Sequence, residues 1–322
     1  MHVYPLLMTP YFRHGQETPW GGHALREQYG KPAPADGTGE SLEISALPGM
    51  ESRAANGPLA GKGLAEIAEL WGEALTGSRD KTFPLLLKLL DARDFLSVQV
   101  HPGDDFALAH DGKLGKSEAW YILNAKPGAK IVYGVDTQGR PLQDIVVAGE
   151  LESCLHWAEA RPGDVFYLPH GMIHALGPGI QCYEIQQSSD ATYRFWDWGR
   201  MGSDGRPRAL HTEKALAVSN PDCHLSAIRD SGNPENGVSK TLLVDDPHFR
   251  LYSVAFSGSF PLEEGRMQFL TPLQPCTVKW EEQSLFVKAF QSVLIPAQLT
   301  GASVSGQGKV LLSVCPNSAV HC

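Results

Sequence analysis

Short segments with the two-residue alternation of β-strands dominate this sequence, and turn-forming residues separate them. Glycine and proline fill the breaks and together make up about a sixth of the 322 residues. Strands this short, each ended by a turn, favour a β-sandwich or a closed barrel over a helical bundle. We expect extended segments at residues 95–101, 119–123, 130–135, 164–168, 181–187 and 192–198.

Helical periodicity is confined to a smaller part of the chain. Residues 61–75 place Leu64, Ile67, Ala68 and Trp71 at helical spacing, which predicts an amphipathic helix. A second helix is expected at about residues 207–218. Residues 84–90 fit either a strand or a helix by pattern alone.

The polar stretch at residues 230–237 is rich in Gly, Pro and Asn and predicts a linker or a long loop. We therefore expect a first domain at residues 1–235, which includes both helical segments. Residues 240–322 show only short β patterns with few acid–base groups near one another. This part is expected to be a small β domain with a supporting role.

The charge balance limits the kinds of partner. Lys and Arg number 27 against 36 Asp and Glu, a net charge of −9, which argues against a general nucleic-acid binder. No segment reaches the roughly 18 apolar residues that a spanning helix needs. The N-terminus lacks a basic region followed by an apolar run, so we expect no secretory signal and a cytoplasmic location.

The cysteines are scattered, with no pair at metal-binding spacing, and are expected to be reduced structural thiols. Cys182 is expected to be a small buried apolar residue. The six are Cys154, Cys182, Cys223, Cys276, Cys315 and Cys322.

The strand expected at residues 95–101 has two different faces, because successive side chains point to opposite sides. One face is apolar (Leu96, Val98, Val100) and the other is polar (Ser97, Gln99, His101). By itself this pattern is typical of a surface strand whose polar face meets water.

Two later motifs favour a metal site instead. Glu118 opens an apolar run, with Lys116 two residues earlier on the same face. Residues 163–174 follow the pattern Gly-x5-Pro-x-Gly-x2-His, which matches the second metal motif of cupin β-barrels and ends at His174. His170, inside the turn of this motif, is expected to be exposed.

Together, His101, Glu118 and His174 form a two-histidine, one-carboxylate set, with Gln99 as a possible fourth ligand. Nitrogen and oxygen donors without thiolate suit Zn²⁺, Fe²⁺ or Mn²⁺. An incomplete protein shell leaves room for water or substrate.

The segment at residues 181–200 adds acid–base groups and cations to this set. Glu184 and Gln186 share one face of a strand by alternation, and Arg194 and Arg200 follow. Surface ion pairing is the alternative interpretation for both arginines. A guanidinium beside a metal could stabilise an enediolate or hold a phosphate through two hydrogen bonds.

With these motifs in the same order, the sequence resembles the class I (type I) phosphomannose isomerases in their short bacterial form. The resemblance covers roughly the first two-thirds of the chain. It implies a double-cupin (jelly-roll) fold with a helical portion, and one Zn²⁺ per chain. It also implies interconversion of mannose 6-phosphate and fructose 6-phosphate. The residues that carry it are 20–22, 39–41, 96–102, 115–121, 169–175, 184–190 and 193–194.

By position, the resemblance implies that His101, Glu118 and His174 bind zinc, with Gln99 as the fourth ligand in some members. Arg194 resembles the catalytic arginine of the family. Residues near the substrate phosphate are implied at Ser97, Lys88, Lys116 and Arg200. Leu42 and His170 depart from the residues usual in the family, and neither position supplies a ligand.

An isomerase of this kind needs a general base to move a proton between two sugar carbons. Glu184 is the candidate, and metal-bound hydroxide is the competitor that the sequence leaves open. Two other functions stay open as well: an Fe²⁺-dependent cupin oxygenase and a non-catalytic cupin that binds sugar phosphates. The expected partner is a small sugar phosphate, with no nucleic acid and no membrane. The oligomeric state is undetermined.

Overall fold

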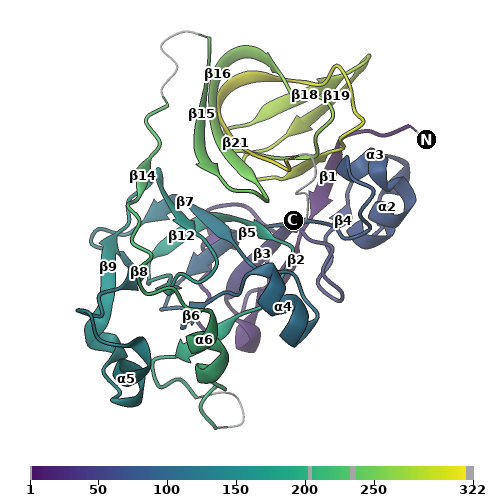
Figure 1. Ribbon diagram of the computed structural model, residues 1–322. Helices are drawn as coiled ribbons and strands as arrows, with labels where there is room; N and C mark the ends of the chain where they lie inside the picture. Colours follow the sequence, from purple (N-terminus) through teal and green to yellow (C-terminus); the bar gives the residue numbers. More distant parts are fainter. Residues whose placement is uncertain (1, 202–204, 233–236, 317–322) are drawn as a thin grey trace. The chain divides into compact units, whose positions relative to one another are not determined.

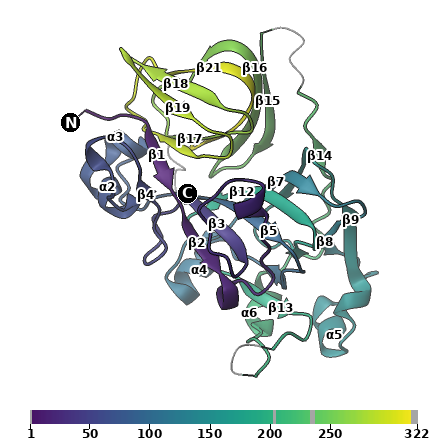
Figure 2. The ribbon, with the colours of Figure 1, turned by 180° about the vertical axis from the view of Figure 1, so that it is seen from behind.

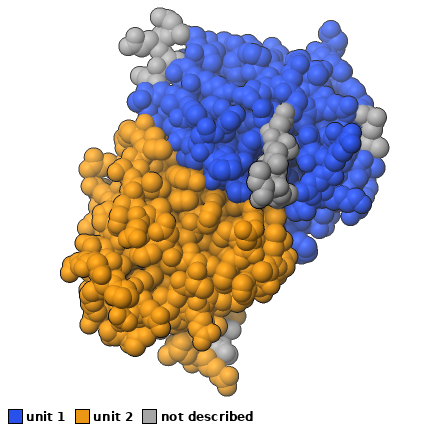
Figure 3. Space-filling model, in the orientation of Figure 1, with its two compact units in different colours: residues 1–12, 41–88, 230–322 blue, residues 13–40, 89–229 orange. Residues whose placement is uncertain are grey.

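The computed structural model describes residues 2–201, 205–232 and 237–316. The chain divides into two compact units, which Figure 3 shows in different colours. Unit 1 comprises residues 1–12, 41–88 and 230–322, and unit 2 comprises residues 13–40 and 89–229.

This division differs from the linear one expected from the sequence, and strand pairing gives the reason. β1 (Leu6–Thr9) pairs with β20 (Val293–Ile295), and with β4 (Arg53–Ala54) on its other side. The N-terminal strand therefore completes a sheet of C-terminal strands. The expected linker begins at the start of the last segment of unit 1, and its residues 233–236 lie outside the described part. The domain boundary at 235–240 stays a prediction.

In the part of the chain that the structure describes, the strands form three sheets (Figures 1 and 2). The first lies in unit 1 and has the order β15-β16-β21-β17-β20-β1-β4, with the hairpin of β18 and β19 beside β21. Its remaining bounds are β15 (Val238–Asp245), β16 (Arg250–Pro261), β17 (Gln268–Pro272), β18 (Cys276–Trp280), β19 (Gln283–Val287) and β21 (Ser303–Val314).

The second and third sheets carry the candidate site. The second has the order β14 (Ile228–Arg229), β10 (Asp164–Leu168), β7 (Glu118–Ala125), β12 (Ile180–Gln187), β5 (Leu85–Ala92), β3 (Thr38–Ile44) and β2 (Tyr11–His14). The third has the order β13 (Tyr193–Trp196), β6 (Val98–Val100), β11 (His174–Ala175), β8 (Lys130–Val135) and β9 (Leu155–Glu159).

One buried core lies between these two sheets in unit 2. Trp120 and Phe166 from the second sheet share a cluster with Ile131 and Tyr133 from the third. The rings of Phe166 and Tyr133 meet edge to face, with centroids 5.1 Å apart. Two packed sheets agree with the sandwich or barrel expected from the strand pattern and with the jelly-roll fold that the family resemblance implied.

The outer face of the third sheet is covered as well. Val98 and Val132 form a second buried cluster with Leu142 of α5 (Leu142–Val147) and Ala215 of α6 (Thr212–Val218). Because Val98 and Val100 point outward, Gln99 between them points inward. The alternation in the sequence also placed Val98 and Val100 on one face of the strand and Gln99 on the other.

One residue of that assignment was wrong. Leu96 packs in the inner cluster, whereas Val98 and Val100 belong to the outer one. The strand begins only at Val98, so the alternation does not extend back to Leu96.

The mainly β fold with a smaller helical portion is confirmed. The ambiguous segment at residues 84–90 is a strand, β5, and Cys182 is fully buried as expected. The five described cysteines are free, and Cys322 lies outside the described part. None of the described helices is both long and apolar enough to span a bilayer. The other helices are α1 (Ala24–Glu27), α2 (Leu64–Trp71), α3 (Glu73–Thr76), α4 (Asp104–Asp111) and the 3-10 turns η1 (Gly15–Glu17), η2 (Gly57–Leu59) and η3 (Leu151–Cys154).

Truncating Phe166 tests the inner core. We expect Phe166→Ala to lower the free energy of unfolding by about 3–5 kcal/mol, because it leaves a cavity beside Tyr133. Urea denaturation followed by fluorescence measures the change. Val147→Ala is the matched control, since Val147 is 80% exposed and its loss should cost no more than about 0.5 kcal/mol. Equal losses for both variants would contradict this account of the core.

Candidate metal centre

Three side chains that the sequence singled out meet inside unit 2. His101 follows β6, Glu118 is the first residue of β7, and His174 begins β11. Their potential ligand atoms all lie within 4.8 Å of one another. The His174 Nε2 atom is 3.3 Å from Glu118 Oε1, and the His101 Nε2 atom is 3.5 Å from Glu118 Oε2. All three side chains are buried.

Strand register explains why residues far apart in the sequence converge here. His174 lies directly opposite Gln99 of β6, and Gln99 lies directly opposite Arg194 of β13. Directly opposed residues point to the same side of a sheet. Gln99, His174 and Arg194 therefore form one row on the inner face of the third sheet. Glu118 reaches the same centre from the second sheet.

Backbone carbonyls fix both histidine rings. The Nδ1–H of His101 donates to the Ala191 carbonyl at 2.8 Å, and the Nδ1–H of His174 donates to the Met172 carbonyl at 2.9 Å. A carbonyl only accepts, so Nδ1 carries a proton in both rings, and in the neutral imidazole Nε2 then has the lone pair. Metal-binding histidines are oriented in this way.

The centre holds acceptor atoms that have no donor. Glu118 Oε1 and His174 Nε2 are buried, and neither has a hydrogen-bond partner in the described part of the chain. Buried polar atoms are nearly always satisfied, because leaving one unpaired costs about 1–3 kcal/mol. A cation bound between them would satisfy both, so the donor set fits a metal ion.

The Lys116 ammonium also lies at this centre. Its Nζ atom is 2.5 Å from Glu118 Oε2 and 2.9 Å from His101 Nε2. Burial alone would raise the pKa of the Glu118 carboxyl, but the charge of Lys116 holds that pKa well below its usual range. Burial and then Lys116 hold the pKa of His101 well below its usual value. The carboxylate is thus charged and the imidazole neutral, the forms that bind metal.

Arg194 adds a cation to the inner face. Its Nε atom is buried and has no hydrogen-bond partner among the described residues. Burial and then the charge of Arg208 lower the pKa of its guanidinium. Because Arg194 lies in the same row as Gln99 and His174, its charge is available to an anion held beside them.

Glu184 occupies the facing sheet. It lies opposite Trp120, whose indole N–H donates to Glu184 Oε2 at 2.7 Å. Its neighbour on the same face, Gln186, lies opposite Glu118. Glu184 is therefore a buried carboxylate on the strand beside Glu118, two residues further along the pairing. It points into the same interior.

The residues predicted to be near the phosphate are spread more widely. The buried Ser97 hydroxyl lies 3.4 Å from Gln99 Oε1. The Arg200 guanidinium donates to the Phe95 carbonyl and lies 3.6 Å from the Asp197 carboxylate. Lys88 is buried in β5 and belongs to unit 1. Their roles stay predictions.

Two supporting residues were missed by motif reasoning. The Gln186 side-chain amide donates to the carbonyls of Gln187 and Ser189, which shapes the loop that presents the Ala191 carbonyl to His101. His211 accepts the backbone N–H of Arg194 through Nδ1 at 3.2 Å. The shared face of Glu184 and Gln186 was a signal for the first. No local pattern marks His211.

The packed sheets and the buried histidine–carboxylate set define a cupin protein with a candidate metal centre. Residues 12–129 match the family model of the catalytic domain of type I phosphomannose isomerases. A mannose-6-phosphate isomerase from Streptococcus mutans is 40% identical over 255 residues, which are 76% of this chain and 78% of that protein. The chain therefore belongs to the type I phosphomannose isomerase family.

Solved structures agree with this assignment. The crystal structure of a mannose 6-phosphate isomerase from Bacillus subtilis matches with a TM-score of 0.88 at 34% identity, covering 96% of this chain and 99% of that one. A phosphomannose isomerase from Salmonella typhimurium, at 17% identity and a TM-score of 0.76, shares the fold.

Removing one candidate ligand tests the centre. We expect His174→Ala to weaken metal binding at least about a hundredfold, because loss of mere outer-shell partners of ligands already costs ten- to a hundredfold. Metal content after dialysis, measured by atomic emission, gives the result. His224→Ala, at an exposed histidine, is the control and should retain metal. Retention of metal by His174→Ala at the level of the control would rule out this ligand set.

Proposed function

We propose that this chain is a metal-dependent aldose–ketose isomerase that interconverts D-mannose 6-phosphate and D-fructose 6-phosphate through a cis-enediolate. The observation that carries the proposal is the buried centre of His101, Glu118 and His174, with Arg194 on the adjacent inner face. Family membership supports the same reaction. The free thiols and the acidic charge balance are consistent with the cytoplasmic location that we propose.

The metal that we propose is one Zn²⁺ per chain. Two imidazole nitrogens and one carboxylate are a donor set that catalytic zinc uses, with a position left open. Gln99, inward-facing and next to His174 across the sheet, is the proposed fourth ligand. When bound, the metal acts as a Lewis acid that polarises the sugar oxygens at C1 and C2.

Arg194 is proposed to stabilise the negative charge that develops on the enediolate. Arg194 is half-buried, and water screens a partly buried guanidinium less than an exposed one. The backbone contacts with His211 hold Arg194 in place, since each of the two residues donates its own N–H to the other.

Glu184 is proposed as the general base. It takes the proton from C2 of the aldose and returns it to C1 of the enediolate, so that one carboxylate serves both half-reactions. Its buried position on the inner face and its hydrogen bond from Trp120 support this role. The Trp120 indole donates to one carboxylate oxygen and so orients the group.

A direct assay tests the proposed function. We expect purified protein to convert mannose 6-phosphate to fructose 6-phosphate and a chelator to abolish this conversion. Added Zn²⁺ should restore it, and no oxygen should be consumed. Oxygen uptake with Fe²⁺ would favour the cupin oxygenase instead. Binding of sugar phosphate without turnover by the metal-loaded protein would favour a non-catalytic role.

Replacing Arg194 separates catalysis from metal binding. We expect Arg194→Ala to lower kcat by about 10²–10³ while metal content stays unchanged, because the guanidinium stabilises charge formed during the reaction. Steady-state kinetics and metal analysis of the same sample give both values. Arg79→Ala, at a 90% exposed side chain, is the matched control. A kcat near that of the control would remove Arg194 from the mechanism.

A further inference from the structure

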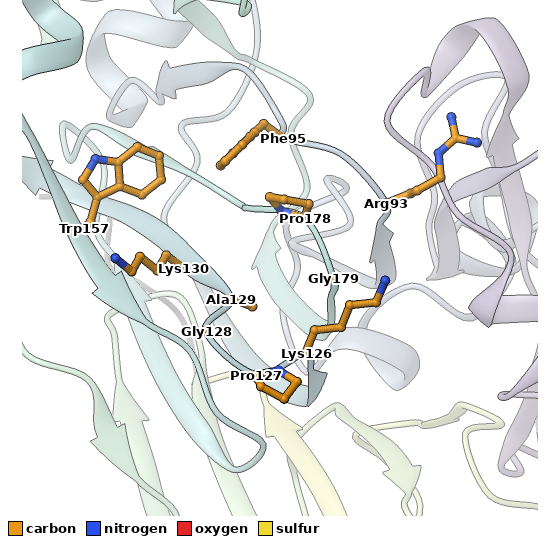
Figure 4. Close-up of a pocket in the computed structure, with 10 residues that line it drawn as sticks. All are labelled: Arg93, Phe95, Lys126, Pro127, Gly128, Ala129, Lys130, Trp157, Pro178 and Gly179. Carbon is orange, nitrogen blue, oxygen red and sulfur yellow. The ribbon is translucent and has the colours of Figure 1, made fainter.

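Unit 2 contains a pocket of about 510 Å³ that the isomerase reaction does not use (Figure 4). Loops at one end of the strands form it. Residues 93–95 follow β5, the turn at residues 126–129 joins β7 to β8, and Pro178 and Gly179 precede β12. Trp157 of β9 closes one side.

The pocket is separate from the metal centre. Glu118 is the first residue of β7, and Lys126 follows the last residue of the same strand. Eight steps along a strand correspond to roughly 25 Å. A ligand group held at Lys126 is therefore outside the reach of the Glu118 carboxylate.

The lining of the pocket is cationic. Arg93, Lys126 and Lys130 line it, and none of its described lining residues carries a carboxylate. Arg93 and Lys126 make no ion pair with any described residue. Cations without an acid partner would attract an anionic ligand.

Two acids near the pocket, Glu159 and Asp94, each have another partner. Glu159 lies across the strands from Lys130, and its carboxylate also binds the guanidinium of Arg161 at 3.0 Å. The Asp94 carboxylate accepts the backbone N–H of Phe95 at 2.7 Å. The Lys126 ammonium thus has no acid partner among the described residues, whereas the Arg93 guanidinium donates to the Pro19 carbonyl at 3.5 Å.

Flat side chains form the remaining wall. The rings of Phe95 and Trp157 lie 5.8 Å apart at 71°, so they meet as an edge and a face. Trp198 stacks on Phe95 at 4.3 Å and donates its indole N–H to the Leu96 carbonyl at 2.7 Å. In Figure 4, Trp157 and Lys130 lie on one side, and Arg93 and Lys126 lie on the other.

The backbone holds Lys126 in position. The Ala129 N–H donates to the Lys126 carbonyl at 3.0 Å, and Pro127 followed by Gly128 at φ +77° closes a type II turn. Gly179 lies against the Lys126 side chain, because a Cβ added there would come within 2.9 Å of Lys126 Cδ. This packing restricts the aliphatic part of Lys126 and leaves its ammonium at the pocket.

We propose that this pocket binds a nucleotide, with the base against Phe95 and Trp157 and the phosphates at Lys126. A volume of about 510 Å³ is in the range of small-molecule sites and far exceeds the space of a single ion. Aromatic walls stack on flat rings, and Lys and Arg bind phosphate oxygens. The pocket combines both features.

Titration of the holoenzyme with ADP tests the proposal. Isothermal titration calorimetry measures binding alone and in the presence of excess mannose 6-phosphate, which fills the active site. We expect one ADP per chain with an affinity that the sugar phosphate leaves unchanged. Inorganic phosphate and glucose 6-phosphate, titrated in the same way, should bind at least about tenfold more weakly, because neither stacks on an aromatic wall.

Two variants locate the site. We expect Lys126→Glu and Trp157→Leu each to weaken ADP binding about tenfold or more while kcat stays unchanged. Lys279→Glu makes the same charge change at an exposed residue of β18 and should bind ADP like the parent. Lys126 is exposed, so its variant keeps the fold even if Trp157→Leu does not.

Each other outcome overturns the proposal. Competition by mannose 6-phosphate without an effect of Lys126→Glu would place ADP in the active site. Equal or tighter binding of glucose 6-phosphate, lost in Lys126→Glu, would make this a sugar-phosphate pocket. Equal binding of inorganic phosphate would show that the aromatic walls contribute nothing. If Lys279→Glu weakened ADP binding as much as Lys126→Glu, the loss of affinity would result from the net charge of the protein and not from this pocket.

Discussion

The buried charge of Glu118 is the constraint on which the centre depends. A carboxylate with no exposed surface stays ionised only where positive charge and donors surround it. Lys116 supplies part of this environment, and Glu118 Oε1 still lacks a donor. A metal cation bound at Glu118 Oε1 would supply the missing positive charge. The same negative charge that requires a nearby cation thus also makes Glu118 suitable as a metal ligand.

The candidate ligand atoms can meet at one cation only if the second and third sheets keep a fixed separation. Glu118 comes from the second sheet and His174 from the third, so the distance between their ligand atoms depends on the core that separates the sheets. Phe166 and Tyr133 fill this core, and Val98 secures the outer face of the third sheet. Packing remote from the chemistry thus sets the geometry of the centre. The loops at the other ends of the same strands are free to form a separate pocket.

Much of this arrangement could be predicted, because β alternation is a local property. It assigned Gln99 and Val98 to opposite faces correctly, and motif spacing selected His101, Glu118 and His174. The alternation assigned Leu96 to the wrong face, because the strand begins only at Val98. It left residues 84–90 undecided, since a short apolar run suits a buried strand and a buried helix equally.

The sequence by itself determined the mainly β fold, the family and the chemical types of the candidate ligands, because these depend on local patterns and on residue identity. Only the tertiary structure decided which atoms meet. Lys116 contacts the candidate ligands His101 and Glu118, Arg200 donates to the Phe95 carbonyl, and the Ala191 carbonyl orients His101. Strand β1 likewise joins a C-terminal sheet. Long-range pairing and main-chain groups set these contacts, and neither leaves a mark in the local sequence.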